Sequence, residues 1–204
     1  VRVGYRTATT SYNCEEWAAA HAIDDQVRAN ADAPYMPEQD AVRFLVQKAM
    51  IKREREFVIN FFSTGNLWTG SSDGADLVGG TDFTRWSNAA STPIEDVSEQ
   101  MARIEANNGL LPNKLVVGRQ VWMDLKNHPD IVDRVKHTSR DAVTTDLVAR
   151  LLGLDEVLVS AAVRNAAGEG TSNNSTHMAS DDALLVYSPA NAGLMTPSGG
   201  YTFV

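Results

Sequence analysis

The stretch LKNHPDIVDRVKHT, residues 125–138, crowds two histidines, two aspartates, an arginine and two lysines into one short segment. His128, His137, Asp130 and Asp133 are side chains that can exchange protons near neutral pH or bind a metal ion. One hypothesis is therefore a small α+β enzyme or ligand-binding domain that uses Asp130, Asp133 and His137. It predicts a stable monomer with a pocket at these residues.

A second interpretation needs no substrate. The residue before a proline is pushed out of helical geometry, so one helix should end there and another should begin at Pro129. Asp130 and Asp133 then lie near the positive end of the new helix, and Lys136 and His137 near its negative end, where the helix dipole favours them. We favour this interpretation. The buried side of this helix is expected to consist of Ile131, Val132 and Val135.

Other acidic and glycine-rich segments give weaker signals. The sequence contains no GxSxG, HExxH, P-loop, GxGxxG or CxxC motif. SSDGADLVGG, residues 71–80, lacks the ligand spacing of an EF-hand. Asp181 and Asp182 are adjacent at a strand start and should point in opposite directions, as in a solvated turn. Residues 198–200, SGG, are expected to form a flexible turn. We therefore predict no catalytic residue, no cofactor and no metal ligand.

The composition limits the possible partners. The 204 residues can form one large domain or two small ones, and the net charge of -8 is the opposite of the basic surface that grips phosphates. If the protein meets nucleic acid, we expect it to enclose it. The single cysteine, Cys14, cannot form an internal disulfide, which fits a reducing cytoplasm. No apolar run has the length of a membrane helix, so we expect no membrane role. Because the chain starts without Met, we expect a processed chain or a fragment.

The strongest structural signal is a long helix over residues 37–62. It has no internal Gly or Pro, a proline at its first turn, and Glu38 and Asp40 near its positive end. At about 1.5 Å per residue its length would be roughly 39 Å, more than twice that of an average helix. Its apolar side chains fall on more than one side, so we expect cover on more than one side at its ends. They are Val42, Phe44, Val46, Ala49, Met50, Ile51, Phe57, Val58, Phe61 and Phe62.

The middle of this helix is charged: Lys52, Arg53, Glu54, Arg55 and Glu56 follow one another. Lys52 and Glu56 have the i,i+4 spacing of a helical ion pair. One interpretation is a solvated stretch of helix. The other is that these charges meet complementary charges on neighbouring subunits, which makes residues 52–56 the subunit-interface candidates. The sequence favours neither.

The segments that flank the long helix are less regular. Residues 1–20 alternate in the manner of a strand, and we interpret them as the return strand of an extended hairpin. Residues 22–34 are polar and are expected to form a loop. Residues 63–92 are rich in Ser, Asn and Gly, but they carry Trp68 and Trp86. We therefore expect a packed excursion rather than a free linker.

Helices and strands alternate in the second half. One helix should begin at Pro93, with Thr92 and Glu95 forming a capping box, and a later one should begin after Thr144 or Thr145. Such interleaving predicts an α+β fold with a mixed sheet. These helices are expected to end at Gly109 and Gly153. The expected strands are residues 113–118, 155–165 and 182–189, and a last strand should start within residues 199–204. Residues 166–181 are expected to form a disordered tip.

The order of these motifs resembles that of a known family. SYNCEEWAAAHAIDDQVRANADAP leads into DAVRFLVQKAMIKREREFVINFF, and NKLVVGRQVWMDLKNHPDIVDRVKHT, DLVARLLGLDEVLVSAAVRNAA and DDALLVYSPANAGLMTPSGGYTFV follow. This series resembles the major capsid proteins of tailed bacteriophages, which share the fold named after phage Hong Kong 97. The resemblance covers nearly the whole chain and lies in order and phrasing, not in a short catalytic motif.

The resemblance implies a division of the chain. Residues 1–37 would be the return half of the extended loop, which in the family reaches over a neighbouring subunit, and the lead-in to the peripheral domain. Residues 38–64 would be the spine helix of that domain, and residues 65–92 a connecting excursion. Residues 93–204 would be the axial domain, with a mixed sheet, and the start of the return to the peripheral domain. The family's N-terminal arm and its last peripheral strands are not present, which implies an incomplete chain.

The resemblance also implies a function. The protein would be a structural major capsid protein, not an enzyme, which self-assembles through pentamers and hexamers into an icosahedral shell. That shell would enclose phage DNA without sequence-specific binding, with scaffold, portal or decoration proteins as further candidate partners. Its place would be the virion, after assembly in the host cytoplasm. The main alternative keeps the fold and makes the shell a nanocompartment that encloses enzymes; the other is the small α+β enzyme.

Overall fold

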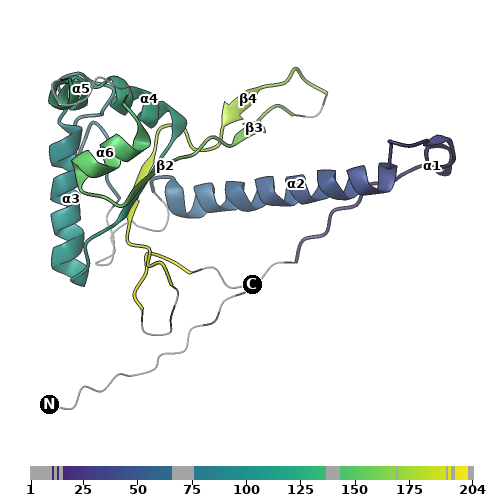
Figure 1. Ribbon diagram of the computed structural model, residues 1–204, viewed down its shortest axis with the longest axis horizontal. Helices are drawn as coiled ribbons and strands as arrows, with labels where there is room; N and C mark the ends of the chain where they lie inside the picture. The colour runs from purple at the N-terminus through teal and green to yellow at the C-terminus, as the bar shows by residue number, and fades with distance from the viewer. Residues whose placement is uncertain are drawn as a thin grey trace, which may run out of the picture. The chain divides into compact units, whose positions relative to one another are not determined.

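The computed structural model describes residues 11, 13, 16–65, 76–136, 143–168, 170–191, 193 and 196–201, and the chain divides into two units, Val1–Met50 and Ile51–Val204. The first unit holds α1, Asp25–Asn30, and most of α2 (Figure 1). A helix thus replaces part of the loop predicted at residues 22–34, and Asp25 lies in its first turn, where the helix dipole favours an acid. The described members of the predicted strand at residues 1–20 lie in no strand, and the others fall outside the described residues.

The long helix α2 spans Pro37–Phe57, with Glu38 and Asp40 in its first turn as predicted. At Val58 it changes into a π-helical turn, η1, Val58–Phe62. The predicted bounds of the long helix, residues 37–62, are therefore confirmed, but its last five residues are π-helical instead of α-helical. The side chains of Val58 and Phe62 are buried, whereas α2 itself buries none. Cover is thus present at Val58 and Phe62, and the cover expected on the other apolar sides stays a prediction.

The second unit contains a three-stranded sheet in the order β2–β1–β5. Strand β1, Lys114–Val117, pairs in parallel with β2, Glu156–Val159, and antiparallel with β5, Ala183–Val186. A parallel pair needs a crossover connection, and helices supply it here. The mixed sheet and the helices confirm the predicted α+β class.

The two faces of the sheet belong to different apolar clusters. Because successive strand residues point to opposite faces, Leu115 and Val117 of β1 join the main core, while Val116 packs with Val58 and Phe62 of η1 on the other face. Figure 1 shows the helices of this unit around the sheet. The main core is built from the sheet and from α3, Pro93–Asn108, α4, Arg119–Asn127, α5, Pro129–Val135, and α6, Thr145–Leu152.

The helices begin and end at the predicted cap and stop residues, and one predicted cap interaction is not formed. Both stops, Gly109 and Gly153, have φ near +70°, a left-handed conformation that glycine adopts without strain. The Oγ1 atom of Thr144 accepts a hydrogen bond from Leu147 N at 3.4 Å, which identifies it as the cap of α6. Thr92 precedes α3, but its side chain makes no capping hydrogen bond, so the predicted capping box was wrong there.

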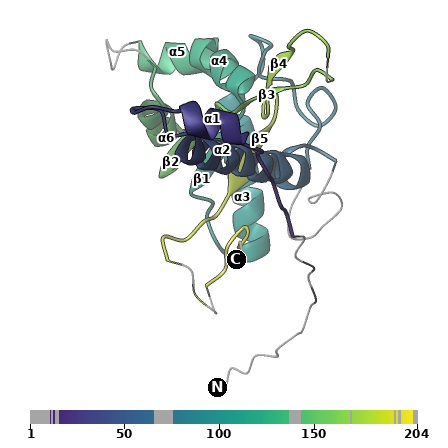
Figure 2. The ribbon, with the colours of Figure 1, turned by 90° about the vertical axis from the view of Figure 1, so that its right-hand side faces the viewer.

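The segment predicted as one strand, residues 155–165, contains two. Strand β2 ends at Val159, and β3, Val163–Asn165, turns away to pair antiparallel with β4, Ser175–His177. The predicted disordered tip is thus largely the turn and second strand of a hairpin. This hairpin projects from the body of its unit in Figure 1 and toward the viewer in Figure 2. No strand starts in residues 199–201, and residues 202–204 lie outside the described part.

Candidate functional site

A buried serine and histidine form the arrangement most like a catalytic pair. The Nε2 atom of His128 lies 3.0 Å from the Oγ atom of Ser91, and both residues are buried, with exposed fractions of 3% and 5%. Their positions follow from local structure: His128 lies between α4 and α5, where Pro129 forces the break that the sequence predicted. A serine next to an imidazole has the geometry of an activated nucleophile. The serine is activated only if the imidazole nitrogen can accept its hydroxyl proton.

The hydrogen bonds of His128 exclude that role. Its Nδ1 atom accepts from the backbone N–H of Asp130 at 3.2 Å, so this nitrogen carries no proton. The proton must then lie on Nε2, which donates toward the carbonyl oxygen of Asn88 at 3.1 Å and the Ser91 hydroxyl. A protonated Nε2 cannot take the hydroxyl proton of Ser91, which is itself donated to Asn88 O at 2.8 Å. The pair therefore ties the segment before α3 to the start of α5.

Of the residues of the enzyme hypothesis, the structure describes Asp130 and Asp133, and neither lines the cavities found in the described part of the chain. Asp130 lies in the first turn of α5 and pairs with Arg134 at 3.5 Å, whereas Asp133 pairs with Lys136 at 2.7 Å. Ile131 and Val135 are buried as predicted, but Val132 is 39% exposed, which corrects that prediction. His137 lies outside the described residues. Arg134 also lies 2.9 Å from Glu95 of α3, so the charges of this helix form ion pairs within it and with α3.

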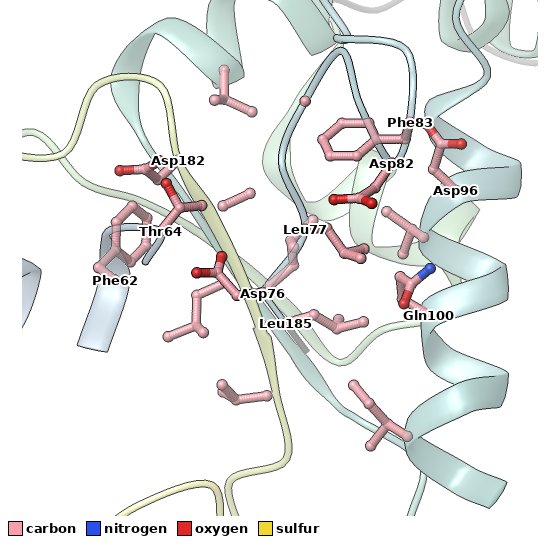
Figure 3. A pocket seen from close by; sticks show the side chains of 18 of the residues that line it. Phe62, Thr64, Asp76, Leu77, Asp82, Phe83, Asp96, Gln100, Asp182 and Leu185 are labelled. Carbon is pink, nitrogen blue, oxygen red and sulfur yellow. The ribbon is translucent and has the colours of Figure 1, made fainter. Parts of the chain in front are cut away.

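The main concavity of the second unit is a cavity of about 1260 Å³ that the sequence analysis did not predict. Figure 3 shows side chains that line it: Phe62 from η1, Asp76, Asp82 and Phe83 from the segment before α3, Asp96 and Gln100 from α3, and Leu185 from β5. Its walls combine aromatic and aliphatic side chains with a large number of acids. The lining carboxylates are Asp76, Asp82, Asp96, Glu99, Asp124, Asp181 and Asp182, against two arginines, Arg85 and Arg103.

Several of these carboxylates also hold the cavity wall in place. Asp82 accepts from the backbone N–H of Val78 at 2.7 Å, and Asp76 accepts from that of Gly65. Asp96 Oδ2 accepts from the indole Nε1–H of Trp86 at 2.8 Å. Trp86 thus belongs to a packed excursion, as predicted, while Trp68 falls outside the described residues. Among the parts of the chain that the structure describes, none of the seven acids forms an ion pair.

The carboxyl of Asp182, which lines this cavity, has a raised pKa. Burial and the neighbouring Asp181 raise the pKa of its carboxyl above the ordinary 3.8, and Asp76 adds to this effect, while a hydrogen bond from the Ser63 side chain opposes it. The prediction of a solvated turn at residues 181–182 therefore needs correction. Asp181 is exposed, but Asp182 is partly buried among other acids. Sequence spacing could not reveal this, because the lining acids come from four segments: the one before α3, α3, α4 and the one before β5.

The predicted charged segment of α2 is ordered. Lys52 Nζ lies 3.3 Å from Glu56 Oε1, which confirms the expected i,i+4 pair. Arg53 and Arg55 are exposed, and Glu54 is half-buried. In the described part of the chain neither arginine belongs to an ion pair. Whether these residues contact neighbouring subunits remains a prediction.

Within the described residues, no group of three or more His, Cys, Asp or Glu side chains is placed to hold a metal ion. None of the helices in that part of the chain is long and apolar enough to cross a membrane.

Comparison with known proteins gives an independent view of the chain. No family model matches it. The "Major capsid protein" of Burkholderia phage BcepMu is 24% identical over 180 residues, which cover 86% of this chain and 56% of that protein. The crystal structure of a phage-related protein from Bordetella bronchiseptica superposes with a TM-score of 0.67 and 25% identity, over 86% of this chain and 58% of the other. The chain thus spans somewhat more than half the length of both relatives. The resemblance to phage major capsid proteins that the ordered motifs indicated is confirmed.

Proposed function

We propose that this chain is part of a structural major capsid protein with the Hong Kong 97-type fold, whose copies assemble into the icosahedral shell of a tailed bacteriophage. The observation that carries the proposal is the match to the BcepMu major capsid protein over 86% of the chain. The partners are then other copies of the chain, as pentamers and hexamers, with scaffold, portal or decoration proteins as additional partners. The place of action is the virion, after assembly in the host cytoplasm.

The proposal assigns a role to each part of the chain. Residues 1–37 form the return half of the extended loop and the lead-in to the peripheral domain. Residues 38–64 form the spine helix, which comprises nearly all of α2 and the π turn η1. Residues 65–92 connect the two domains, and residues 93–204 form the axial domain and the start of the return to the peripheral domain.

The charge of the chain supports enclosure of DNA rather than tight binding. With 26 acidic and 18 basic residues, the chain lacks the excess of Lys and Arg with which proteins neutralise phosphates. An acidic shell repels the packaged polymer and holds it by confinement, so the proposal needs no sequence-specific contact.

The exposure of α2 supports assembly with neighbours. Large apolar side chains along it are exposed, including Val42 at 60% and Met50 at 67%. A helix with such side chains on its surface gains stability when another surface covers it. We accordingly assign the residues Lys52, Arg53, Glu54, Arg55 and Glu56 to a contact between subunits.

The test is electron microscopy of the full-length protein, expressed together with its neighbouring genes. Icosahedral particles that contain nucleic acid are expected. Particles filled with a protein cargo would instead indicate a nanocompartment. A monomer that stays monomeric under all assembly conditions would refute a shell role, and turnover that is lost in His137→Ala would favour the enzyme hypothesis.

A variant addresses the charged segment directly. In Arg53→Glu/Arg55→Glu, the subunit should keep its fold, because both side chains are exposed, but shell formation should be impaired. Circular dichroism of the dissociated protein provides the folding control. Normal particles from this variant would mean that residues 52–56 are merely solvated.

A further inference from the structure

We infer that the acidic cavity of the second unit is the docking site for the outward face of Arg53, Phe57 and Phe61 on a second copy of this chain. The inference rests on the proposed function, because it requires neighbouring copies. We call these three residues the outer stripe. Its chemistry is two aromatic rings and one cation, which matches a cavity with apolar walls and excess carboxylates.

The outer stripe lies on one side of the helix. Arg53, Phe57 and Phe61 follow one another at i,i+4 spacing, which places side chains on one face. The two phenyl rings stack, with centroids 5.7 Å apart, and their residues are 42% and 40% exposed. The stripe therefore offers a preformed aromatic surface beside a guanidinium group.

The stripe cannot enter the cavity of its own chain. Val58 and Phe62 face inward, and Phe62 lines that cavity (Figure 3). At about 100° per residue, Arg53 lies roughly 140° around the helix from Val58. Arg53 thus points away from the surface that Phe62 contacts, and only another copy can bring an outer stripe to the cavity.

The cavity supplies both kinds of complementarity. Phe83, Trp86 and Leu185 give it apolar walls, while Glu99 and Asp181 are exposed carboxylates of the same lining. A guanidinium group is planar and always charged, so it pairs well with carboxylates, and its flat face also stacks on aromatic rings. Burial and the neighbouring Asp181 together raise the pKa of Asp182, and the approach of a cation would oppose both effects.

Such a contact has a defined symmetry. The stripe and the cavity are different surfaces, so each copy gives one and receives the other. A head-to-tail interface of this kind forms closed rings when its rotation closes. This is the geometry required of neighbours within a pentamer or hexamer.

The first experiment is a charge swap in the full-length protein. Arg53→Glu should lower the yield of assembled particles on the order of tenfold or more, because the reversed charge then faces carboxylates at every contact. Adding Glu99→Lys/Asp181→Lys to the same chain should restore assembly. The matched control is Arg119→Glu, the same change at an exposed position of α4 that belongs neither to residues 52–56 nor to the cavity lining, and it should assemble as the wild type does.

The second experiment locates the contact without changing its charges. In a Cys14→Ser background, copies with Asn60→Cys, beside the stripe, are mixed with copies with Asp181→Cys, at the cavity. A short bifunctional maleimide should give cross-linked dimers only in the mixture and only after assembly. Normal shells without such dimers, together with a failed charge swap, would overturn the inference and leave the proposed function intact. A wild-type protein that never assembles would overturn both.

Discussion

The carbonyl oxygen of Ser180 occupies the space in which any side chain on Gly118 would have to begin. This close approach exists because the segment before β5 caps the start of α4 with its backbone. Gly118 N–H donates to Asp182 O at 2.9 Å, and Gln120 N–H donates to Ser180 O at 3.1 Å. The first N–H groups of a helix have no partner within it, so the strand-leading segment satisfies them.

Gly118→Ala should therefore destabilise the second unit. The added methyl group overlaps backbone, which cannot rotate away as a side chain can, so we expect a loss of about 1–3 kcal/mol in the free energy of unfolding. Urea denaturation measures this loss. Gly168→Ala is the matched control, because nothing lies within 4 Å of its new methyl group. Equal stability of the two variants would contradict the backbone capping.

His128→Ala should be more costly. It removes the acceptor for Asp130 N–H and the donor to Asn88 O, and it leaves a hole in a buried region. We expect a loss of about 2–4 kcal/mol, from the unpaired groups and the cavity together. His128→Asn should recover part of it, since asparagine also accepts at a helix N-cap. His177→Ala, in an exposed position of β4, should change stability by less than about 0.5 kcal/mol.

Trp86→Phe tests the indole bond to Asp96. Phenylalanine keeps much of the apolar contact but loses the Nε1–H donor, so the carboxylate oxygen loses a partner at 2.8 Å. A loss of about 1–2 kcal/mol is expected, by analogy with other hydrogen bonds to charged groups. The comparison is Trp122→Phe, which also borders the main core. If the Asp96→Ala background, which has no acceptor, leaves the effect of Trp86→Phe unchanged, the bond contributes little.

Asp182→Asn should stabilise the protein at neutral pH. The raised pKa of Asp182 means that the folded state holds its proton more tightly than the unfolded chain. Ionisation therefore lowers the free energy of unfolding as pH rises from 3.8 through the raised pKa, and the cost is constant above it. The neutral amide avoids this cost and can still accept from Ser63. Unfolding at a series of pH values should show the advantage of the variant at pH 7 and its disappearance below 3.8.

The starts and ends of helices could be predicted from the sequence where one proline or glycine determines them. Pro129 breaks the chain between α4 and α5, and Gly109 and Gly153 end their helices, because backbone geometry leaves few alternatives. The helix α1 was missed because one turn of polar residues has no apolar period. The hairpin β3–β4 was missed because its short strands are mostly exposed, so no alternation marks them.

The cavity could not be predicted for a different reason. Asp82, Glu99 and Asp182 belong to separate segments, and only the pairing of β5 with β1 and the packing of α3 bring them together. Asp182 was expected to be solvated because adjacent strand residues point apart. Asp181 is exposed, as that rule suggests. The rule could not predict that Asp182 is partly buried among other acids of the cavity. His128 could likewise be picked out in the sequence. Which of its ring nitrogens carries the proton could not, because this depends on the backbone N–H of Asp130.

The absence of buried side chains along α2 predicts the order in which the helices exchange their amide protons. Most helical stability in proteins comes from packing, and the side chains of α2 are not buried, so this helix lacks much of that stabilisation. Its amide protons should exchange with solvent deuterium long before those of α3 and α6, whose apolar sides lie in the main core. Slowing of that exchange in α2 alone would then record, residue by residue, the moment at which a free chain gains its neighbours.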